Sequence, residues 1–255
     1  MCYSGGTMSA EKDKRPAPER GVPEPPWRSP RHVAKGSRVP LSRDAIVDAG
    51  IAVLDEYGLD GLSMRRVAER LGAGAPSLYW HIRNKSELLQ LISERLTADI
   101  VLPEPQPARW QEQLKDVARQ MRAIAQRHRD GARITLGRLP LGPTVARFAE
   151  WLFDLLEPVG IPPRIIAGVG DLAALYVGAY TFEESLGLAS PTGEELPPQA
   201  IVAMLRSYLV SLPVADFPHV HAFVDDLLGG DADERFEFGL DVIVRGIAAY
   251  ATAGE

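Results

Sequence analysis

The sequence contains a single cysteine, Cys2, among its 255 residues, so no internal disulfide can form and we expect a reducing, cytoplasmic environment. An apolar segment near the N-terminus is also missing, which argues against a secretory signal. There is no phosphate-binding glycine loop, no Gly-x-Ser-x-Gly motif and no cysteine nucleophile beyond the first residues. These absences argue against a secreted protein and against an enzyme.

Long hydrophobic runs are scarce. Residues 165–182 approach the length of a membrane span, but Asp171 lies in their middle, and their many Gly and Ala residues suit close helix packing. We therefore predict a buried helix here and no association with a membrane.

Charge is distributed unevenly along a chain whose net charge is −6. Residues 1–40 carry eight Lys and Arg against four Asp and Glu, whereas residues 102–255 carry thirteen against twenty-one. The proline-rich first forty residues predict a flexible arm. We expect this arm either to follow DNA phosphates or to be a solvated leader without a role. Its basic residues next to the first predicted helix are Arg28, Arg31, His32, Lys35 and Arg38.

Residues 41–101 predict three helices and a connecting fourth. Ser42 caps a first helix that ends at Gly58, and Ser63 caps a second that ends at Gly72. Serine side chains accept hydrogen bonds from the unpaired backbone N–H groups of a first turn, and glycine adopts the left-handed conformation that ends a helix.

The third and fourth predicted helices carry equally clear signals. Pro76 suits the first helical position of the third, and Leu78 and Ile82 can anchor it to the core. Asn84, followed three residues later by Glu87, resembles a capping box that opens the fourth. Together with the second helix, the third forms a helix-turn-helix.

A helix that reads the major groove needs small or polar residues near its N-terminus and flanking groups that hold phosphates. Four consecutive large residues, 78–81, cannot all face a core, so at least two are expected to be exposed. The residues that we expect to contact DNA are Ser63, Arg65, Pro76, Ser77, Tyr79, Trp80, His81 and Lys85.

Residues 102–255 alternate amphipathic stretches with Pro and Gly breaks, which predicts an all-α protein. His219 and His221 lie near two aspartates, but on a helix they point about 200° apart, so we expect no metal site. The predicted helices cover 110–127, 132–136, 144–158, 162–188, 198–212, 217–228 and 233–252.

The stretch LSRDAIVDAGIAVLDEYGLDGLSMRRVAERLGAGAPSLYWHIRNKSELL resembles the DNA-binding domain of the tetracycline-repressor (TetR) family. The similarity continues in HRDGARITLG and FEFGLDVIVRGI, so it covers most of residues 41–255. The resemblance implies a homodimer whose C-terminal domains bind a small molecule, which displaces helix four and releases the operator. It implies the same DNA contacts. A dimer places two reading helices about 34–36 Å apart, which predicts a palindromic operator.

Two apolar stretches are expected to form the dimer contact as a four-helix bundle, with an intramolecular core as the alternative. One is the helix at 162–188. The other is a stripe on the last helix, made of Phe236, Leu240, Ile243, Val244, Ile247 and Ala251.

The ligand cavity is where the sequence departs from the tetracycline repressors, in which the drug arrives with Mg²⁺. The resemblance places Thr135 where those repressors have the metal-binding histidine, and Phe182 where they have the metal-binding carboxylate. If helix eight is shifted by one residue, Glu183 takes the place of Phe182. In the same way, Val101 is placed where those repressors have a histidine on helix four, and Val117 where they have an asparagine on helix five. The resemblance therefore implies a metal-free hydrophobic or aromatic effector and no cofactor. The expected lining is Val101, Val117, Met121, Thr135, Arg138, Leu139, Tyr176, Tyr180 and Phe182, with Tyr180 and Arg138 as the orienting donors.

The sequence thus predicts a basic arm (1–40), a helix-turn-helix domain (41–101) and a helical ligand-binding and dimerisation domain (102–255). The predicted function is a ligand-responsive repressor that leaves its operator when a small hydrophobic molecule binds. A ligand-independent architectural DNA-binding protein is the alternative, although its dimerisation module could be far shorter. A third hypothesis, a helical enzyme with an incidental helix-turn-helix, has no motif in its favour.

Overall fold

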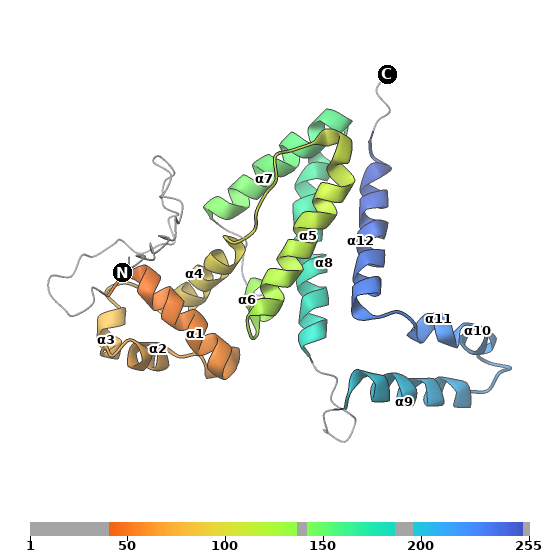
Figure 1. Cartoon of the computed structure of the whole chain (residues 1–255), viewed down its shortest axis with the longest axis horizontal. Coiled ribbons are helices and arrows are strands. Elements are labelled where there is room, and N and C mark those ends of the chain that lie inside the picture. Colours follow the sequence, from red (N-terminus) through yellow and green to blue (C-terminus); the bar gives the residue numbers. More distant parts are fainter. Residues whose placement is uncertain (1–40, 137–141, 187–195, 252–255) are drawn as a thin grey trace, which may run out of the picture.

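The computed structural model describes residues 41–136, 142–186 and 196–251, and every regular element among them is a helix (Figure 1). The all-α prediction is confirmed. The predicted arm at residues 1–40 lies outside the described residues. In chain order the helices are α1 (Arg43–Gly61), α2 (Met64–Arg70), α3 (Ala75–Leu78), α4 (Lys85–Thr97), α5 (Trp110–Arg127), α6 (Gly131–Leu136), α7 (Pro143–Leu156), α8 (Pro163–Ser185), α9 (Pro198–Ser211), α10 (Pro218–Ala222), α11 (Val224–Leu228) and α12 (Ala232–Ala248), with 3₁₀ turns at Pro107–Arg109 and Glu157–Val159.

Helices α1, α2 and α4 begin where their caps predict, whereas α3 begins at Ala75, one residue before Pro76, without a side-chain cap. Ser42 Oγ accepts from Ala45 N at 3.1 Å, and Ser63 Oγ accepts from Arg66 N at 3.3 Å. Asn84 Oδ1 accepts from Glu87 N at 2.9 Å, whereas the Glu87 carboxylate accepts from Arg83 N. These side chains satisfy donors that a helical first turn leaves unpaired.

Helix α1 continues past its predicted end at Gly58. This glycine has φ 72° and ψ 176°, a conformation that costs other residues free energy, and it bends the helix before a last turn that reaches Gly61. Gly72, with φ 61°, ends α2 as predicted.

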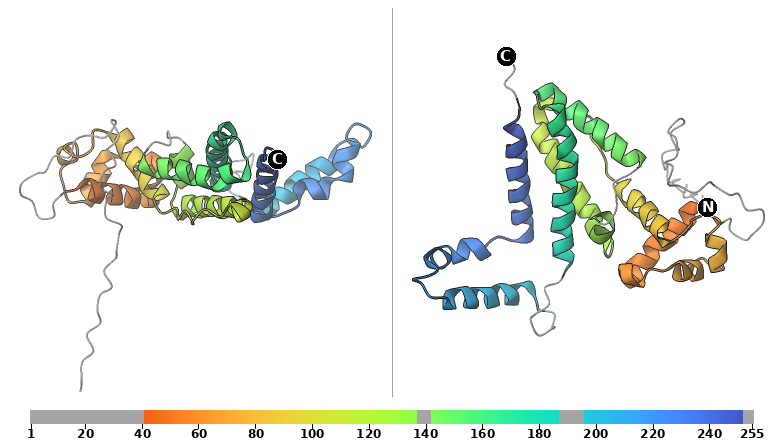
Figure 2. Two further views of the ribbon diagram at one scale, coloured as in Figure 1. Left: turned by 90° about the horizontal axis from the view of Figure 1, so that it is seen from above. Right: turned by 180° about the vertical axis from the view of Figure 1, so that it is seen from behind.

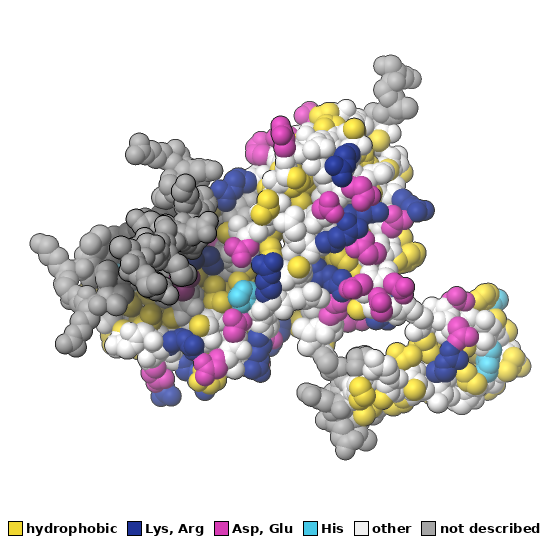
Figure 3. Space-filling view, viewed as in Figure 1, with side chains coloured by type: hydrophobic (Ala, Val, Ile, Leu, Met, Phe, Trp, Pro, Cys, Tyr) yellow, Lys and Arg dark blue, Asp and Glu magenta, His cyan; other side chains and the backbone are white. Residues whose placement is uncertain are grey.

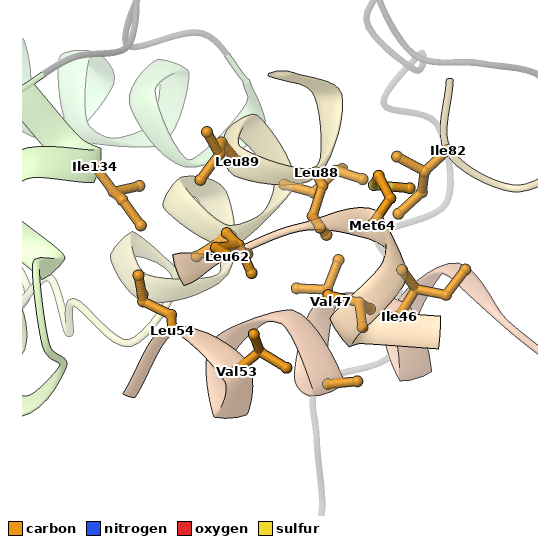
Figure 4. Close-up of a cluster of buried hydrophobic side chains, with 14 of the residues drawn as sticks. Ile46, Val47, Val53, Leu54, Leu62, Met64, Ile82, Leu88, Leu89 and Ile134 are labelled. Atoms are coloured by element: carbon orange, nitrogen blue, oxygen red, sulfur yellow. The ribbon is translucent and has the colours of Figure 1, made fainter. Parts of the chain in front are cut away.

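One apolar core holds α1 to α4 together and reaches into the next domain (Figure 4). Leu78 and Ile82, which flank α3, are fully buried in it. Ile134 of α6 belongs to the same cluster, so the C-terminal domain contributes a side chain to the core of the first. The cluster fixes the position of α3 relative to α6.

A second core lies among α5, α7, α8 and α12, where α8 packs against α5, α6 and α7 (Figure 1). Phe236, Leu240, Val244 and Ile247 of α12 are buried in this core and in the adjoining cluster with Tyr176 and Tyr180. The predicted dimer stripe on the last helix is therefore intramolecular core. The prediction was wrong because periodicity shows that one face is buried but not which partner buries it.

The free faces of α8 and α12 carry other residues. Leu172 and Leu175 of α8 are exposed, as are Phe238, Val242 and Tyr250 in and after α12. Helix α8 has the length and composition of a membrane span, with a mean hydropathy of 1.5 and 28% of its window buried. One such helix is weak evidence for a membrane. Its exposed side chains show that the protomer buries α8 on one side only, so burial of the other side by a second copy stays a prediction.

Helices α9, α10 and α11 form a hairpin that projects from the body (Figures 1 and 2). The predicted helix at 217–228 is two short helices separated at Phe223. Hydrophobic side chains cover much of the visible surface of this hairpin (Figure 3). Its exposed large apolar residues are Val202, Met204, Leu205, Tyr208, Val210, Val214, Phe217, Phe223 and Leu227.

Candidate DNA interface and ligand-binding region

The candidate reading surface is the short helix α3 and the turns that follow it. Tyr79 and Trp80 are 53% and 66% exposed, beside the fully buried Leu78 and Ile82. Backbone bonds from Tyr79 N to Pro76 O and from His81 N to Leu78 O continue the helical path beyond α3. Pro76 and Ser77 are exposed at its start. The structure thus displays two aromatic rings on a rigid, buried base.

Two further predicted contacts lie at the start of α2. Ser63 caps this helix, and the Arg65 side chain is 81% exposed with an ion pair to Glu69 at 3.3 Å. The helix α2 that carries these positions packs against α3. An exposed pair of this kind contributes little to stability, so the Arg65 guanidinium is available to another anion at small cost.

Lys85 and His81 lie differently from the prediction. Lys85 Nζ donates to Leu59 O at 3.2 Å, so its ammonium lies at the end of α1 rather than out in solvent. His81 is half-buried, and its carbonyl accepts from Arg43 Nε and Nη2. These contacts tie the turn after α3 to both ends of α1.

A cluster of polar contacts joins the end of α1 to the corner between α5 and α6. Asp130 Oδ2 accepts from Leu59 N at 2.8 Å, and its Oδ1 accepts from Arg133 at 3.1 Å. Arg133 also contacts Asp60, and His128 Nδ1 lies 3.0 Å from Asp55. We call these residues the α1–α6 clasp. Sequence reasoning missed it, although HRDGARITLG contains three of its members.

Asp130 is the centre of the clasp. Burial raises the pKa of its carboxyl, but the bonds from Leu59 N and Arg133 outweigh burial and lower it. Among the described residues it is the one non-glycine with positive φ, 58°. A Cβ built on Gly58 would lie 2.9 Å from its Oδ2, so the kink of α1 leaves room for this carboxylate.

The predicted ligand-lining residues are divided between a packed interior and the surface. Val117 is buried, and Met121 packs beside Tyr176 and Tyr180 against Phe236. Thr135 Oγ1 donates within α6, to Gly131 O and Ala132 O, while Phe182 is half-buried. Val101 is 68% exposed, so it does not line an interior. Arg138 and Leu139 lie outside the described residues.

Both tyrosines of this set already have hydrogen-bond partners. Tyr176 Oη donates to Phe236 O at 2.9 Å, and Tyr180 Oη donates to Ala232 O at 2.7 Å. Burial raises the pKa of Tyr176. The Tyr180 hydroxyl, expected to orient a ligand, thus holds α12 against α8 in this structure.

A cavity of about 460 Å³ lies elsewhere, between the segment after α4 and one face of α7. None of the seven predicted lining residues that the structure describes borders it. Its walls are Leu102, Pro103, Glu104, Pro105, Pro143, Ala146, Arg147, Glu150, Trp151 and Asp154.

Comparison with known proteins decides the family. Residues 46–92 match the profile of bacterial regulatory proteins of the tetR family, and residues 102–251 match the tetracyclin repressor-like C-terminal domain. The chain belongs to the TetR family. The TetR-family resemblance inferred from the sequence is confirmed, and the protein is a DNA-binding transcriptional regulator rather than an enzyme.

Individual TetR-family relatives cover most of the chain. The tetracycline repressor protein class D of Escherichia coli is 39% identical over 216 residues, 84% of this chain and 92% of its own. The HTH-type transcriptional repressor DrrR1 of Streptomyces coeruleorubidus is 31% identical over 231 residues, 87% and 82% of the two chains. The structure of ActR from Streptomyces coelicolor in complex with actinorhodin aligns with a TM-score of 0.77 at 38% identity, covering 85% of this chain and 99% of that one.

Three ion pairs that sequence reasoning missed join α5 to α12 in this TetR-family protein. Lys115 Nζ lies 2.8 Å from Asp241 Oδ1, and Arg119 binds both carboxylate oxygens of Glu237 at 2.7 Å. One turn further, Arg122 pairs with Asp233 and with Glu184 of α8. Spacings of three and four place the basic residues on one face of α5 and the acidic residues on one face of α12, which the sequence does show. Nothing in the sequence indicates that these two faces pair.

The bonds in this ladder shift the pKa values of its members. The bond from Arg119 lowers the pKa of Glu237, and the bond from Lys115 lowers that of Asp241. The carboxylates in turn raise the pKa values of Arg119 and Arg122. Arg122 also lies over the Phe236 ring, 4.5 Å from its centroid. The ladder therefore fixes the face that α12 turns toward the body.

Proposed function

We propose that this protein is a homodimeric repressor that binds a palindromic operator and leaves it when a small hydrophobic or aromatic molecule, without a metal, binds the C-terminal domain. The observation that carries the proposal is the α1–α6 clasp. It joins the helix that supports the reading surface to α6, where Thr135 stands as a proposed ligand residue. A displacement of α6 would therefore be passed to the reading helix.

The proposed DNA contacts are the eight predicted residues, with their roles adjusted to the structure. Tyr79 and Trp80 provide exposed rings for sugars and thymine methyl groups, and Ser77 and Pro76 occupy the end that approaches base edges. Ser63 and Arg65 would reach the backbone from α2. His81 and Lys85 act through the bonds that hold α3 to α1, with Lys85 releasing Leu59 O if it reaches a phosphate.

The proposed dimer forms through the exposed faces of α8 and α12. Leu172, Leu175, Phe238 and Val242 are too large and apolar to remain in solvent together without cost, and the two helices are neighbours. Two copies that pair these faces would make a four-helix bundle. This replaces the buried stripe proposed from the sequence.

The proposed effector site lies among α5, α6 and α8, at Val117, Met121, Thr135, Tyr176, Tyr180 and Phe182. None of these side chains is a carboxylate or an imidazole, which supports a ligand that arrives without Mg²⁺. Because both tyrosine hydroxyls are bonded to α12, an entering ligand has to replace those bonds. The actinorhodin bound by ActR supports an aromatic effector.

An operator selected from a random duplex pool tests the proposal. Bound operator is followed by fluorescence anisotropy while actinorhodin or other planar aromatics are added, with EDTA or with Mg²⁺. We expect release in EDTA, with no requirement for Mg²⁺. Release of DNA only when Mg²⁺ is present would contradict the metal-free effector, and binding that no compound disturbs would favour the architectural alternative.

A matched pair of tyrosine variants tests the reading surface. Tyr79→Ala should abolish operator binding, whereas Tyr208→Ala should leave it intact, because Tyr208 is 62% exposed on the distant α9. Sedimentation should show dimers for both variants. Loss of the dimer in Tyr79→Ala, or equal loss of DNA binding in both, would contradict the assignment.

A further inference from the structure

The cavity beside α7 has a chemical character that the proposed function does not use. One wall is a proline-rich extended segment, with Pro103 and Pro105, and the other is the face of α7 that carries Trp151. Trp151 Nε1 donates to Pro103 O at 2.7 Å, which fixes the floor. Gln113 holds the same segment from the other side, through Glu104 O and Gln106 N. The groove is thus a rigid feature with an apolar floor.

The rim of this groove is acidic. Glu104, Glu150 and Asp154 border it, against a single base, Arg147. The three carboxylate side chains belong to exposed residues, so they remain accessible to an incoming cation. The groove has proline on one wall, a largely buried tryptophan (5% exposed) at its floor and an acidic rim. It suits a proline-rich segment with arginines, because proline rings pack on apolar surfaces and guanidinium groups pair with carboxylates.

The chain contains such a segment. Residues 23–31 read PEPPWRSPR, with two arginines against one glutamate. In a polyproline II helix, which has three residues per turn, positions three apart share a face. Pro23 and Pro26 would therefore lie together, with Arg28 close behind them. The net charge of this segment is opposite in sign to that of the groove.

The segment is also attached close to the groove. Leu41 leads into α1, whose Asp44 pairs with Arg95 of α4 at 3.0 Å. The neighbouring Glu94 lies against Gly142, where a Cβ would be 3.4 Å from its carboxyl carbon, and the next residue, Pro143, lines the groove. Ten residues between 31 and 41 span up to about 33–36 Å when extended. The attachment point and the groove are therefore within reach of each other.

We propose that residues 23–31 dock in the groove between α7 and the segment 102–105 of the same chain. A short covalent tether that spans the distance gives an effective concentration in the millimolar range, so even a site with a Kd of about 1 mM would be about half occupied. Docking of this segment would keep Arg28 and Arg31 away from DNA phosphates.

Disulfide trapping in the full-length protein tests this docking. With Cys2→Ser as background, Ser29→Cys is combined with Ala146→Cys, which lies in the groove, or with Ala149→Cys as the control. Both alanines are exposed on α7, and only Ala146 borders the groove. We expect mild oxidation to close the 29–146 disulfide about tenfold faster than the 29–149 disulfide, because docking raises the local concentration of the thiol.

A charge variant completes the test without involving DNA or any effector. Glu150→Gln with Asp154→Asn should slow closure of the 29–146 disulfide severalfold, as should high salt. Equal rates for positions 146 and 149, or no response to the charge variant, would overturn the proposal. A disulfide-linked dimer would place the arm on another copy and would overturn its assignment to the same chain. The rates of disulfide closure do not depend on DNA or effector, so they test docking even if no compound releases the operator.

Discussion

The two domains of this protein are held together in different ways. In the first, helices that follow one another directly share one core, and three of the four begin at a side chain that caps them. In the second, helices more than one hundred residues apart in sequence are joined by an ion-pair ladder, and large apolar faces remain exposed. Local signals are sufficient for the first arrangement, whereas the second depends on pairings that only the folded chain brings about.

The largest expected effect comes from truncating the core beneath the reading surface. Leu78→Ala should destabilise the protein by about 2–5 kcal/mol, because a fully buried leucine leaves a cavity. Leu205→Ala on α9, where the side chain is 41% exposed, should change stability by less than about 0.5 kcal/mol. Urea unfolding measures both. Equal losses would show that the hairpin is buried against a second copy in solution.

A somewhat smaller effect is expected at the kink in α1. Gly58→Ala should cost about 1–3 kcal/mol for its backbone conformation and more for displacing the Asp130 carboxylate. Gly72→Ala is the matched control, since its φ is also positive but a Cβ there meets nothing within 4 Å. The difference between the two, measured by urea unfolding, isolates the clasp. An equal loss of unfolding free energy in both variants would show that the Asp130 carboxylate moves aside without loss of stability.

Caps of the two domains can be compared directly, with effects of about 1 kcal/mol. Ser63→Ala removes the cap of α2, and Asp231→Ala removes a reciprocal capping box in which Asp231 and Glu234 each accept from the other's backbone. We expect both to lower the thermal midpoint, and Ser63→Ala alone to weaken operator binding as well. Operator affinity that falls equally in both variants would argue against a DNA contact at Ser63.

The smallest effects are expected from acid titration of the ladder and the clasp. The pKa values of Asp130, Glu237 and Asp241 are lowered by folding, so their stabilisation is present above the unfolded pKa values and is lost as pH falls below about 4. Urea midpoints between pH 3 and pH 7 measure the loss. Glu237→Gln should flatten this dependence. An unchanged profile would show that Glu237 does not contribute to the pH dependence of stability.

The same contrast explains how much the sequence predicts. Ser42, Ser63, Pro76 and Asn84 act on their own first turns, so the start of each of the first four helices was predictable. Residues 110–127 were also predicted to be a helix, and α5 has these limits although no side chain caps it. Strong local periodicity and nearby breaks define such a helix.

Predictions failed where a side chain has a choice of partners. The DNA contact of Lys85 stays a prediction, but its bond to Leu59 O in the DNA-free chain was not foreseen, because a long side chain reaches several partners. Phe236 could have faced a second copy or the body, and the ladder beside it decides for the body. Val101 was placed in the pocket by register alone, but its backbone N–H is bonded to Gln120 and its side chain faces outward. Each of these outcomes depends on a contact distant in sequence.

The ladder between α5 and α12 has a consequence for DNA recognition. Its carboxylates flank the buried stripe of α12, while Phe238 and Val242 lie on the opposite side of the same helix. Turning α12 by one residue, about 100°, would break all three pairs at once. Contacts within the protomer therefore fix the rotation of α12 about its axis, and with it the direction of its outward face. In a twofold assembly built on that face, the separation of the two reading elements would be set by lysine, arginine and carboxylate groups that never approach a base pair.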